Sequence, residues 1–241
     1  MKNKSYSFFC PAYYDENNIE TVVEKAVSLF SEIAEDYEIF LIDDGSPDDT
    51  GKVCEALSKK YEKVKVIHHK TNLGYGVALK DGFLNANKFE YVCFTDGDNQ
   101  YDVYDFKKMI PLLPEYDMVI GLREHNANSH LRKFISGCYN FSIRLLFGIH
   151  FRDMSAALRI VKRSAVNSIS IVCEGSFAPA EIIIKLDKLG YKIGTVPISS
   201  YPRIHGKSTS LSPGNFTKTI VEMIKVFINI KTNQYWNGHK Q

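Results

Sequence analysis

Hydrophobic and polar positions in the first half of the chain alternate between two patterns. Short runs of β-branched and aromatic residues are typical of strands, and apolar residues that recur every three or four positions are typical of amphipathic helices. The pattern predicts strands over residues 5–10, 38–42, 64–68, 91–95 and 118–121. It predicts helices over residues 19–31, 49–61 and 74–87. This alternation predicts an α/β fold with a mostly parallel sheet and flanking helices.

The second half is less regular. It predicts a helix over residues 129–147, a strand over 158–162, a helix over 177–189 and a strand over 193–198. A final amphipathic helix over residues 215–231 has Lys218, Glu222 and Lys225 on one polar face. Such a helix either docks on the core or another subunit, or lies on a membrane surface. We therefore expect one main domain over residues 1–212 and a C-terminal amphipathic helix with its tail over 213–241.

Charge is divided unevenly between the two halves of the 241 residues. Residues 1–120 carry 13 Lys, no Arg and 22 acidic residues, a net charge of −9, whereas residues 121–241 have a net charge of +11. This asymmetry suggests a metal-handling half and a half that meets phosphates or an acidic membrane. The five cysteines form no CxxC pair, which favours reduced thiols in a cytoplasmic protein.

Two acidic motifs follow predicted strands, where ligands of parallel sheets collect. Asp96 and Asp98 flank Gly97, and Gln100 adds a further oxygen on the same stretch. Oxygen ligands suit Mg²⁺ or Mn²⁺, and a cation would offset the repulsion between the two carboxylates. A structural turn is the alternative for this motif taken alone.

The second acidic motif is the pair Asp43 and Asp44, which ends another apolar strand. Residues 48–50 can cap the next helix, but capping does not explain two carboxylates at the tip of the strand. They could accept hydrogen bonds from a nucleobase or ribose, or play a structural part.

Other motifs narrow the class of ligand. Residues 72–76, Asn-Leu-Gly-Tyr-Gly, open a helix whose N-terminus could face an anion. No GxGxxG follows the first strand and no GxxxxGK[ST] is present, which disfavours a nucleotide oxidoreductase and a P-loop protein. Arg123, Arg132 and Arg203 follow strands or lie in loops, and arginine matches phosphate oxygens.

Together these motifs resemble those of the family 2 glycosyltransferases, and most closely the polyprenyl-phosphate sugar transferases of the dolichyl-phosphate mannosyltransferase type. The similar segments are residues 11–16, 42–50, 72–79, 96–100, 121–123, 196–198 and 203–208, in that order. The resemblance implies a GT-A fold and inverting transfer of a hexose from a UDP- or GDP-linked sugar. Residues 97, 194–195 and 208–210 differ from the usual pattern of the mannosyltransferase type. These differences affect the identity of the sugar and of the lipid more than the assignment to the transferases.

The resemblance also implies roles for single residues. Asp96, Asp98 and Gln100 would hold Mg²⁺ or Mn²⁺ on the diphosphate, and Arg123 and Arg132 would grip the acceptor phosphate. Asp96, Asp98 and these two arginines are the catalytic candidates. The nucleotide-sugar site would comprise Pro11, Tyr13, Glu16, Asp43, Asp44, Asn72, Gly74, Asp96, Gly97, Asp98, Arg203 and Ser208.

The acceptor is either a polyprenyl phosphate or a sugar hydroxyl in a cell-surface glycan. An ionised phosphate needs no general base, whereas a hydroxyl does, and Glu174, Glu181 and Asp153 are the carboxylates that could serve. A catalytically silent module that binds a nucleotide sugar or scaffolds a partner is the alternative of another class. We expect a cytoplasmic protein, peripheral on the inner face of the membrane or bound to a membrane-embedded partner, with no nucleic-acid partner.

Overall fold

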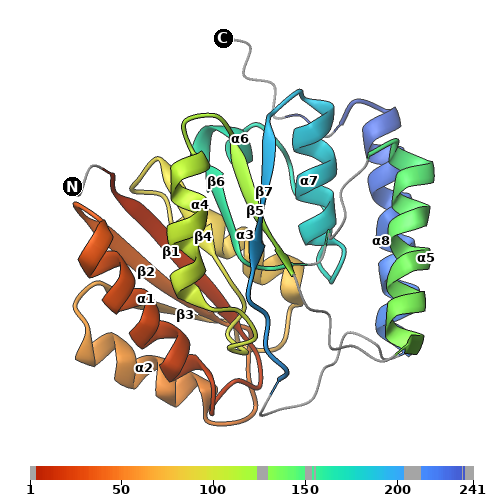
Figure 1. Cartoon of the computed structure of the whole chain (residues 1–241). Coiled ribbons are helices and arrows are strands. Elements are labelled where there is room, and N and C mark those ends of the chain that lie inside the picture. Colours follow the sequence, from red (N-terminus) through yellow and green to blue (C-terminus); the bar gives the residue numbers. More distant parts are fainter. Residues whose placement is uncertain are drawn as a thin grey trace.

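The computed structural model describes residues 4–123, 130–149, 154, 156–203, 213–234 and 236. Within them seven strands form one sheet in the order β3-β2-β1-β4-β6-β5-β7 (Figure 1). The strands are β1 (Tyr6–Ala12), β2 (Tyr37–Asp43), β3 (Val64–His68), β4 (Tyr91–Phe94), β5 (Met118–Arg123), β6 (Arg159–Lys162) and β7 (Ile193–Ile198). Only β6 runs antiparallel to its two neighbours among these strands. The predicted α/β fold with a mostly parallel sheet is therefore confirmed.

Helices cover both faces of this sheet (Figure 1). They are α1 (Ile19–Ile33), α2 (Thr50–Lys60), α3 (Tyr75–Asn85), α4 (Phe106–Met109), α5 (His130–Phe147), α6 (Arg163–Asn167), α7 (Ala178–Lys188) and α8 (Pro213–Lys231). The sequence pattern did not predict α4 or α6, because helices of four or five residues are too short to show a 3.6-residue period. The longer predicted helices are present with small differences at their ends.

Helix α1 shows why the longer helices could be predicted. Its buried side chains recur at the spacing of one helical stripe: Ile19, Val22, Val23, Ala26, Leu29 and Phe30. Burial of such a stripe against a sheet stabilises a helix far more than its intrinsic propensity does. Phe30 lies against Phe8 of β1, with ring centroids 5.7 Å apart.

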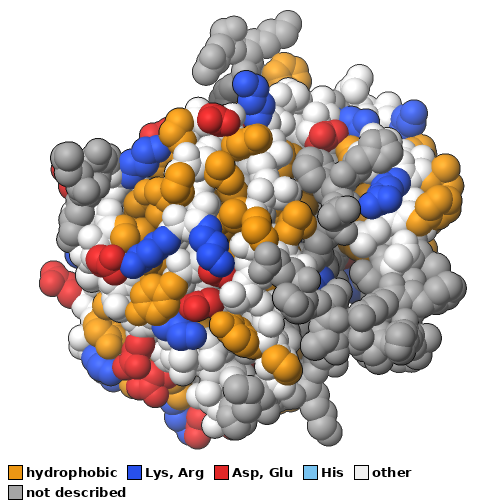
Figure 2. All heavy atoms as spheres, viewed as in Figure 1, with side chains coloured by type: hydrophobic (Ala, Val, Ile, Leu, Met, Phe, Trp, Pro, Cys, Tyr) orange, Lys and Arg blue, Asp and Glu red, His pale blue; other side chains and the backbone are white. Residues whose placement is uncertain are grey.

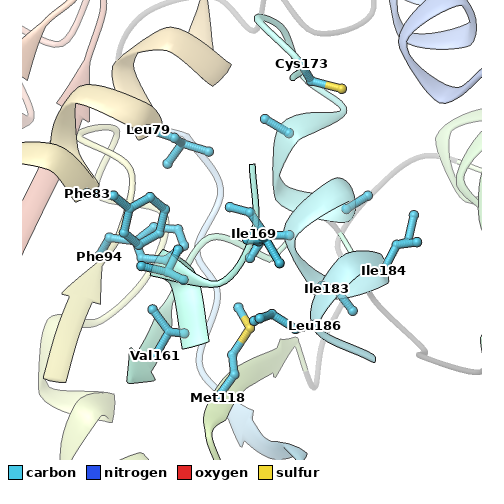
Figure 3. Close-up of a cluster of buried hydrophobic side chains, with 14 of the residues drawn as sticks. Leu79, Phe83, Phe94, Met118, Val161, Ile169, Cys173, Ile183, Ile184 and Leu186 are labelled. Carbon is cyan, nitrogen blue, oxygen red and sulfur yellow. The ribbon is translucent and has the colours of Figure 1, made fainter. Parts of the chain in front are cut away.

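The sheet separates two hydrophobic clusters. One lies beneath α1, α2 and α4, and the other lies between the sheet and α3, α5, α6, α7 and α8. In the second cluster Phe9 and Phe94 stack with centroids 5.0 Å apart, and Phe83 meets both rings edge-on. Figure 3 shows Phe83 and Phe94 beside aliphatic side chains that come from both the sheet and α7. This packing gives the strand ends a rigid base.

Helices α5 and α8 lie side by side beyond α7 (Figure 1). Phe147 of α5 meets Phe227 of α8 at a centroid distance of 6.0 Å, and Val226 is fully buried. Helix α8 therefore docks on the core, one of the two alternatives that its sequence left open. The division of the chain after residue 212 stays a prediction. No helix in the described part of the chain has the length and apolar character needed to cross a bilayer.

Candidate active site

The loops that follow β1, β2 and β4 meet at one edge of the sheet, because these strands are parallel neighbours. Ala12 at the end of β1 lies opposite Asp43 at the end of β2. The amide of Asp44 donates to the carbonyl of Ala12 at 3.0 Å, and the amide of Gly97 donates to the carbonyl of Pro11 at 3.0 Å. The strand-end motifs of the sequence thus come together at the carboxyl edge, where ligands bind in sheets of this kind.

A cluster of buried and partly buried carboxylates lies at this edge. Asp98 is only 5% exposed, and its Oδ2 accepts a hydrogen bond from Nη2 of Arg203 at 2.7 Å. The hydroxyl of Tyr75 donates to Oδ1 of Asp96 at 2.5 Å. Arg203 lies 105 residues further along the chain than Asp98, so the fold brings a predicted loop residue onto a predicted metal ligand. Tyr75 was not among the predicted site residues.

A third carboxylate, Asp15, was also missed. It is 4% exposed, its Oδ2 accepts from the amide of Tyr13 at 3.0 Å, and its buried Oδ1 has no hydrogen-bond partner among the described residues. A Cβ atom at Gly97 would lie 3.1 Å from Oδ2 of Asp15, so the two segments are in close contact. Asp15 belongs to the strand-end motif over residues 11–16, and this position in the sequence could have identified it as a site residue.

Excess negative charge marks these carboxylates. Burial, together with the nearby charge of Asp98, raises the pKa of Asp96 to about 7. Burial also raises the pKa of Asp15 to about 6, against the lowering effect of its hydrogen bond from Tyr13, and Asp98 adds to the rise. Three acids this close together carry more negative charge than the contact with Arg203 offsets, and either protons or a cation can supply the missing positive charge.

The donor atoms of this cluster fit a hard divalent cation. Mg²⁺ is commonly held by one or two carboxylates, with the remaining ligands coming from water and substrate phosphates. Asp96 and Asp98 offer such carboxylates, and the unpaired Oδ1 of Asp15 is a buried acceptor beside them. Within the described ranges no three His, Cys, Asp or Glu side chains already stand together as a metal site. The predicted roles of Asp96 and Asp98 as ligands stay predictions.

Asp44 is held by the chain itself at the end of β2. Its Oδ1 lies 2.7 Å from Nδ1 of His69 and accepts from the amide of Leu73, and its Oδ2 accepts from the amide of Gly74 at 2.9 Å. His69 in turn meets Asp81 of α3 at 2.9 Å. Gly74 has φ of +104°, a conformation that favours glycine. Asp44 therefore shapes the turn that leads into α3.

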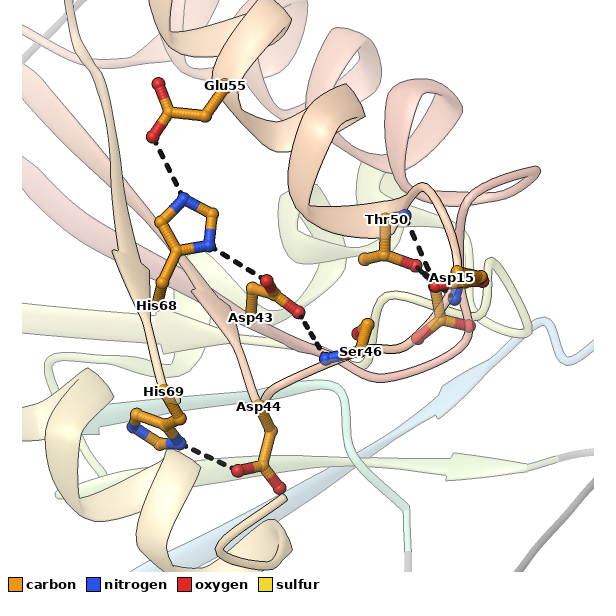
Figure 4. A network of polar contacts seen from close by, with 9 residues as sticks. Asp15, Asp43, Asp44, Ser46, Thr50, Glu55, His68 and His69 are labelled. Atoms are coloured by element: carbon orange, nitrogen blue, oxygen red, sulfur yellow. Dashed lines mark hydrogen bonds and ion pairs between the residues drawn. The ribbon is translucent and has the colours of Figure 1, made fainter. Parts of the chain in front are cut away.

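Asp43 makes a similar bridge on the other side of the strand (Figure 4). Its Oδ1 accepts from the amide of Ser46 at 3.0 Å, and its Oδ2 lies 2.8 Å from Nδ1 of His68. Nε2 of His68 lies 2.9 Å from Glu55 of α2. The pKa of His68 is raised, since the bonds to Asp43 and Glu55 outweigh the lowering effect of burial. Whether Asp43 or Asp44 contacts a nucleoside stays a prediction.

The remaining donor-site candidates lie around the cluster. Glu16 is partly buried, and its Oε2 accepts from the amide of Asp49 at the start of α2. Asn72 is exposed in the turn before α3. The side-chain amide of Gln100 is satisfied when its nitrogen donates to Asp98 at 2.9 Å and its oxygen accepts from the backbone amide of Arg203 at 3.2 Å. In that orientation the oxygen of Gln100 is directed at the Arg203 backbone, and its role as a metal ligand stays a prediction.

The two predicted acceptor-phosphate residues lie at the end of β5 and in the helix after it. Arg123 is the last residue of β5, at the same edge of the sheet as the acidic cluster. Arg132 belongs to the first turn of α5, and its side chain lies outside the described part of the structure. Ser208 also falls outside the described residues. The roles assigned to these three residues stay predictions.

Residues 7–170, more than half of the chain, match the model of glycosyl transferase family 2. This protein belongs to glycosyl transferase family 2. The matched segment contains both the strand-end motifs and the acidic cluster. The edge of the sheet described above is therefore the candidate active site of a glycosyltransferase.

Individual relatives are similar at low identity. CsbB of Bacillus subtilis (strain 168), itself only provisionally named a glycosyltransferase, is 33% identical over 177 residues, which are 73% of this chain and 54% of that protein. The dodecaprenyl-phosphate galacturonate synthase of Rhizobium johnstonii is 25% identical over 213 residues, 86% of this chain and 62% of its own. The dolichyl-phosphate beta-glucosyltransferase of Saccharomyces cerevisiae is 27% identical over 233 residues, 86% of this chain and 69% of its own. The chain thus spans roughly half to two thirds of the length of these relatives.

Solved structures share the fold. Glucosyl-3-phosphoglycerate synthase from Mycobacterium tuberculosis, in complex with Mn²⁺, UDP-glucose and phosphoglyceric acid, aligns with a TM-score of 0.71 at 17% identity. The alignment covers 93% of this chain and 80% of that one. At this identity the likeness establishes the GT-A architecture, which agrees with the predicted fold.

Proposed function

We propose that this glycosyltransferase moves a hexose from a UDP- or GDP-linked sugar to a polyprenyl phosphate, with inversion and with Mg²⁺ or Mn²⁺ as cofactor. The observation that carries the proposal is the cluster of Asp15, Asp96 and Asp98 beside Arg203 at the carboxyl edge of the sheet, in which Asp15 and Asp98 are buried and Asp96 is partly buried. Two relatives named for polyprenyl-phosphate sugar transfer support the choice of acceptor. Complexes of a structural neighbour with UDP-glucose and Mn²⁺ support the choice of donor and metal.

The chain's own residues account for the donor side of the reaction. Asp96 and Asp98 would hold the cation, which when bound neutralises charge on the diphosphate leaving group. Tyr75 fixes the orientation of Asp96 through its hydrogen bond, and Arg203 can exchange its contact with Asp98 for a phosphate oxygen of the donor. Preorganised positive groups of this kind stabilise the charge that develops as the glycosidic bond breaks.

On the acceptor side, an oxygen of the lipid phosphate would attack the anomeric carbon while the bond from that carbon to the nucleoside diphosphate breaks. The phosphate is ionised near neutral pH, so it loses no proton and needs no base. Arg123 and Arg132 would hold it in place. One of the carboxylates considered as a base for a sugar hydroxyl, Glu181, is fully buried and binds the amides of Val172 and Cys173. Glu181 is therefore unsuited to act as a base.

The surface of α5 and α8 suits the membrane on which such an acceptor is found. Its exposed apolar side chains are Phe141, Leu145, Leu146, Ile220, Val221, Ile224 and Ile228. Exposed Arg144, Lys225 and Lys231 accompany them, and the one acid of α8, Glu222, is buried. On the side of the molecule where these helices lie, Figure 2 shows hydrophobic and basic side chains together. Apolar side chains flanked by cations match an anionic lipid surface.

A transfer assay tests the proposal. Purified protein is incubated with Mg²⁺ or Mn²⁺, a panel of UDP- and GDP-sugars and undecaprenyl phosphate, and the organic extract is analysed by mass spectrometry. A new lipid-phosphate hexose that is absent with Asp98→Ala is the expected result. Donor binding without a lipid product would favour a sugar-hydroxyl acceptor, to be tested with Glu174→Gln. Donor binding without turnover on any acceptor would indicate a silent binding module.

A second assay tests the membrane surface separately. The protein should co-sediment with vesicles that contain phosphatidylglycerol and much less with vesicles of phosphatidylcholine alone. Ile224→Asp, which places a charge on the exposed apolar face, should abolish co-sedimentation while transfer to a short, soluble polyprenyl phosphate is retained. Equal sedimentation of the variant and the parent protein would refute this docking surface.

A further inference from the structure

A buried carboxylate of the last helix, α8, joins that helix to the loop that precedes α7. Glu222 of α8 is 5% exposed. Its Oε1 accepts from the amides of Glu174 at 3.0 Å and Gly175 at 2.6 Å, and its Oε2 lies 3.3 Å from the amide of Phe177. These three amides precede α7, where the helix dipole also favours a negative charge. One side chain of α8 thus satisfies the backbone of a whole turn.

The fit around this carboxylate is close. A Cβ atom at Gly175 would lie 3.0 Å from both oxygens of Glu222, which is tighter than an ordinary contact. Lys225, one turn further along α8, donates to the carbonyl of Val172 at 3.2 Å. The loop over residues 172–177 is therefore held to α8 at two places.

The same loop supports the turn that opens α3. The amide of Gly76 donates to the carbonyl of Glu174 at 2.8 Å, and a Cβ atom at Gly74 would collide with that carbonyl. Residue Glu174 thus gives its amide to Glu222 and its carbonyl to Gly76. A shift of this residue would be passed directly to the first turn of α3.

The first turn of α3 carries groups of the candidate active site. Tyr75 donates to Asp96, and the amides of Leu73 and Gly74 donate to Asp44. Hydrogen bonds therefore form an unbroken path from α8, through the loop over residues 174–177, to the acidic cluster.

We propose that Glu222 is a positioning residue for the donor site: it holds the loop over residues 174–177 against α3 and so fixes Tyr75 and the turn at Gly74. This inference rests on the proposed function for its catalytic readout. In this proposal α8 has two functions: its exposed apolar face meets a lipid surface, and its buried Glu222 supports the donor site.

The test compares Glu222→Ala, Gly175→Ala and the double variant. Glu222→Ala should raise the donor KM and the Kd for UDP or GDP with Mg²⁺ by about tenfold, because several charge-assisted hydrogen bonds are lost. It should leave the KM for the lipid acceptor unchanged. Gly175→Ala should act in the same direction, because the new methyl group displaces the carboxylate. In the double variant the carboxylate is gone and the methyl group at residue 175 has room. Gly175→Ala should therefore raise the donor KM no further than Glu222→Ala alone does.

A destabilising control separates positioning from loss of stability. Arg163 lies at the opposite edge of the sheet and donates to the carbonyl of Ala86 at 3.1 Å. Arg163→Met should lower the melting temperature without changing the donor KM. Glu222→Ala should change the KM at temperatures well below its own melting point. A donor KM that stays at the parent value in Glu222→Ala, or effects of the two single variants that simply multiply in the double variant, would overturn the inference.

Hydrogen exchange distinguishes failure of this inference from failure of the proposed function. The amides of Leu73, Gly74 and Gly76 should exchange faster in Glu222→Ala than in the parent protein. Faster exchange in Glu222→Ala, together with a parent protein that binds neither UDP nor GDP, would uphold the structural link and refute the proposed donor. Unchanged exchange, with an active parent protein, would refute the link alone.

Discussion

Replacing Asp96 by Asn should stabilise the cation-free protein while it abolishes transfer. Asn keeps an oxygen that can accept from Tyr75, so the hydrogen bond at this position survives and the charge does not. Burial and the proximity of Asp98 make the ionised form of Asp96 unfavourable in the folded protein. Stability and function are therefore opposed at this residue.

The magnitude follows from the rise in the pKa of Asp96 from 3.8 to about 7. A folded-state pKa above the unfolded one means that the folded protein binds more protons, so the free energy of unfolding falls as the pH rises from about 4 to about 7. The full rise corresponds to about 4 kcal/mol, of which roughly two thirds falls between pH 5 and pH 8. Because Asp96 is partly exposed, solvent screening reduces this difference, and we expect about 2 kcal/mol.

The assay is urea unfolding of the parent protein and Asp96→Asn at pH 5 and pH 8, in EDTA and in excess MgCl₂ or MnCl₂. In EDTA the free energy of unfolding of the variant, relative to that of the parent protein, should rise by about 2 kcal/mol between pH 5 and pH 8. The metal should stabilise the parent protein at pH 8 and leave the variant unchanged, since only a site with affinity for the cation gains from it.

Asp117 provides a control of the opposite sign. Although burial opposes it, the hydrogen bond from Lys162 lowers the pKa of Asp117. Asp117→Asn should therefore lose stability relative to the parent protein, with the loss fully present above pH 4 and vanishing in stronger acid. A stability difference between Asp96→Asn and the parent protein that is the same at pH 5 and pH 8 would refute the electrostatic reasoning for the acidic cluster.

Two further predictions concern the framework beneath the site. A Cβ atom at Gly82 of α3 would collide with the ring of Phe9, so Gly82→Ala should cost about 1–3 kcal/mol in urea unfolding, and an unchanged midpoint would show that the helix can move away from the sheet. Arg159 is fully buried and donates to the carbonyls of Met154, Ala156 and Pro179. Arg159→Met should destabilise the protein by about 2–5 kcal/mol, because three buried carbonyl groups lose their donor, whereas a loss below 1 kcal/mol would mean that water replaces the guanidinium.

Local patterns in the sequence determined most of the secondary structure. The buried stripe of α1 and the continuous apolar runs of β1, β2 and β4 are properties of neighbouring residues, so they could be recognised without the fold. The positions of Asp43, Asp44, Asp96 and Asp98 after strands also followed from the sequence, because parallel strands bring their carboxyl ends to one edge. Family membership, expected from the order of these motifs, is confirmed.

Contacts between distant segments could be decided only by the tertiary structure. The pairing of Arg203 with Asp98 spans 105 residues, and the bond from Gly175 to Glu222 spans 47. Neither leaves a periodic trace, because each depends on where loops return after the sheet has formed. The antiparallel insertion of β6 between β4 and β5 is of the same kind. Burial is likewise a property of the assembled fold, and it is the largest cause of the raised pKa values of Asp15 and Asp96.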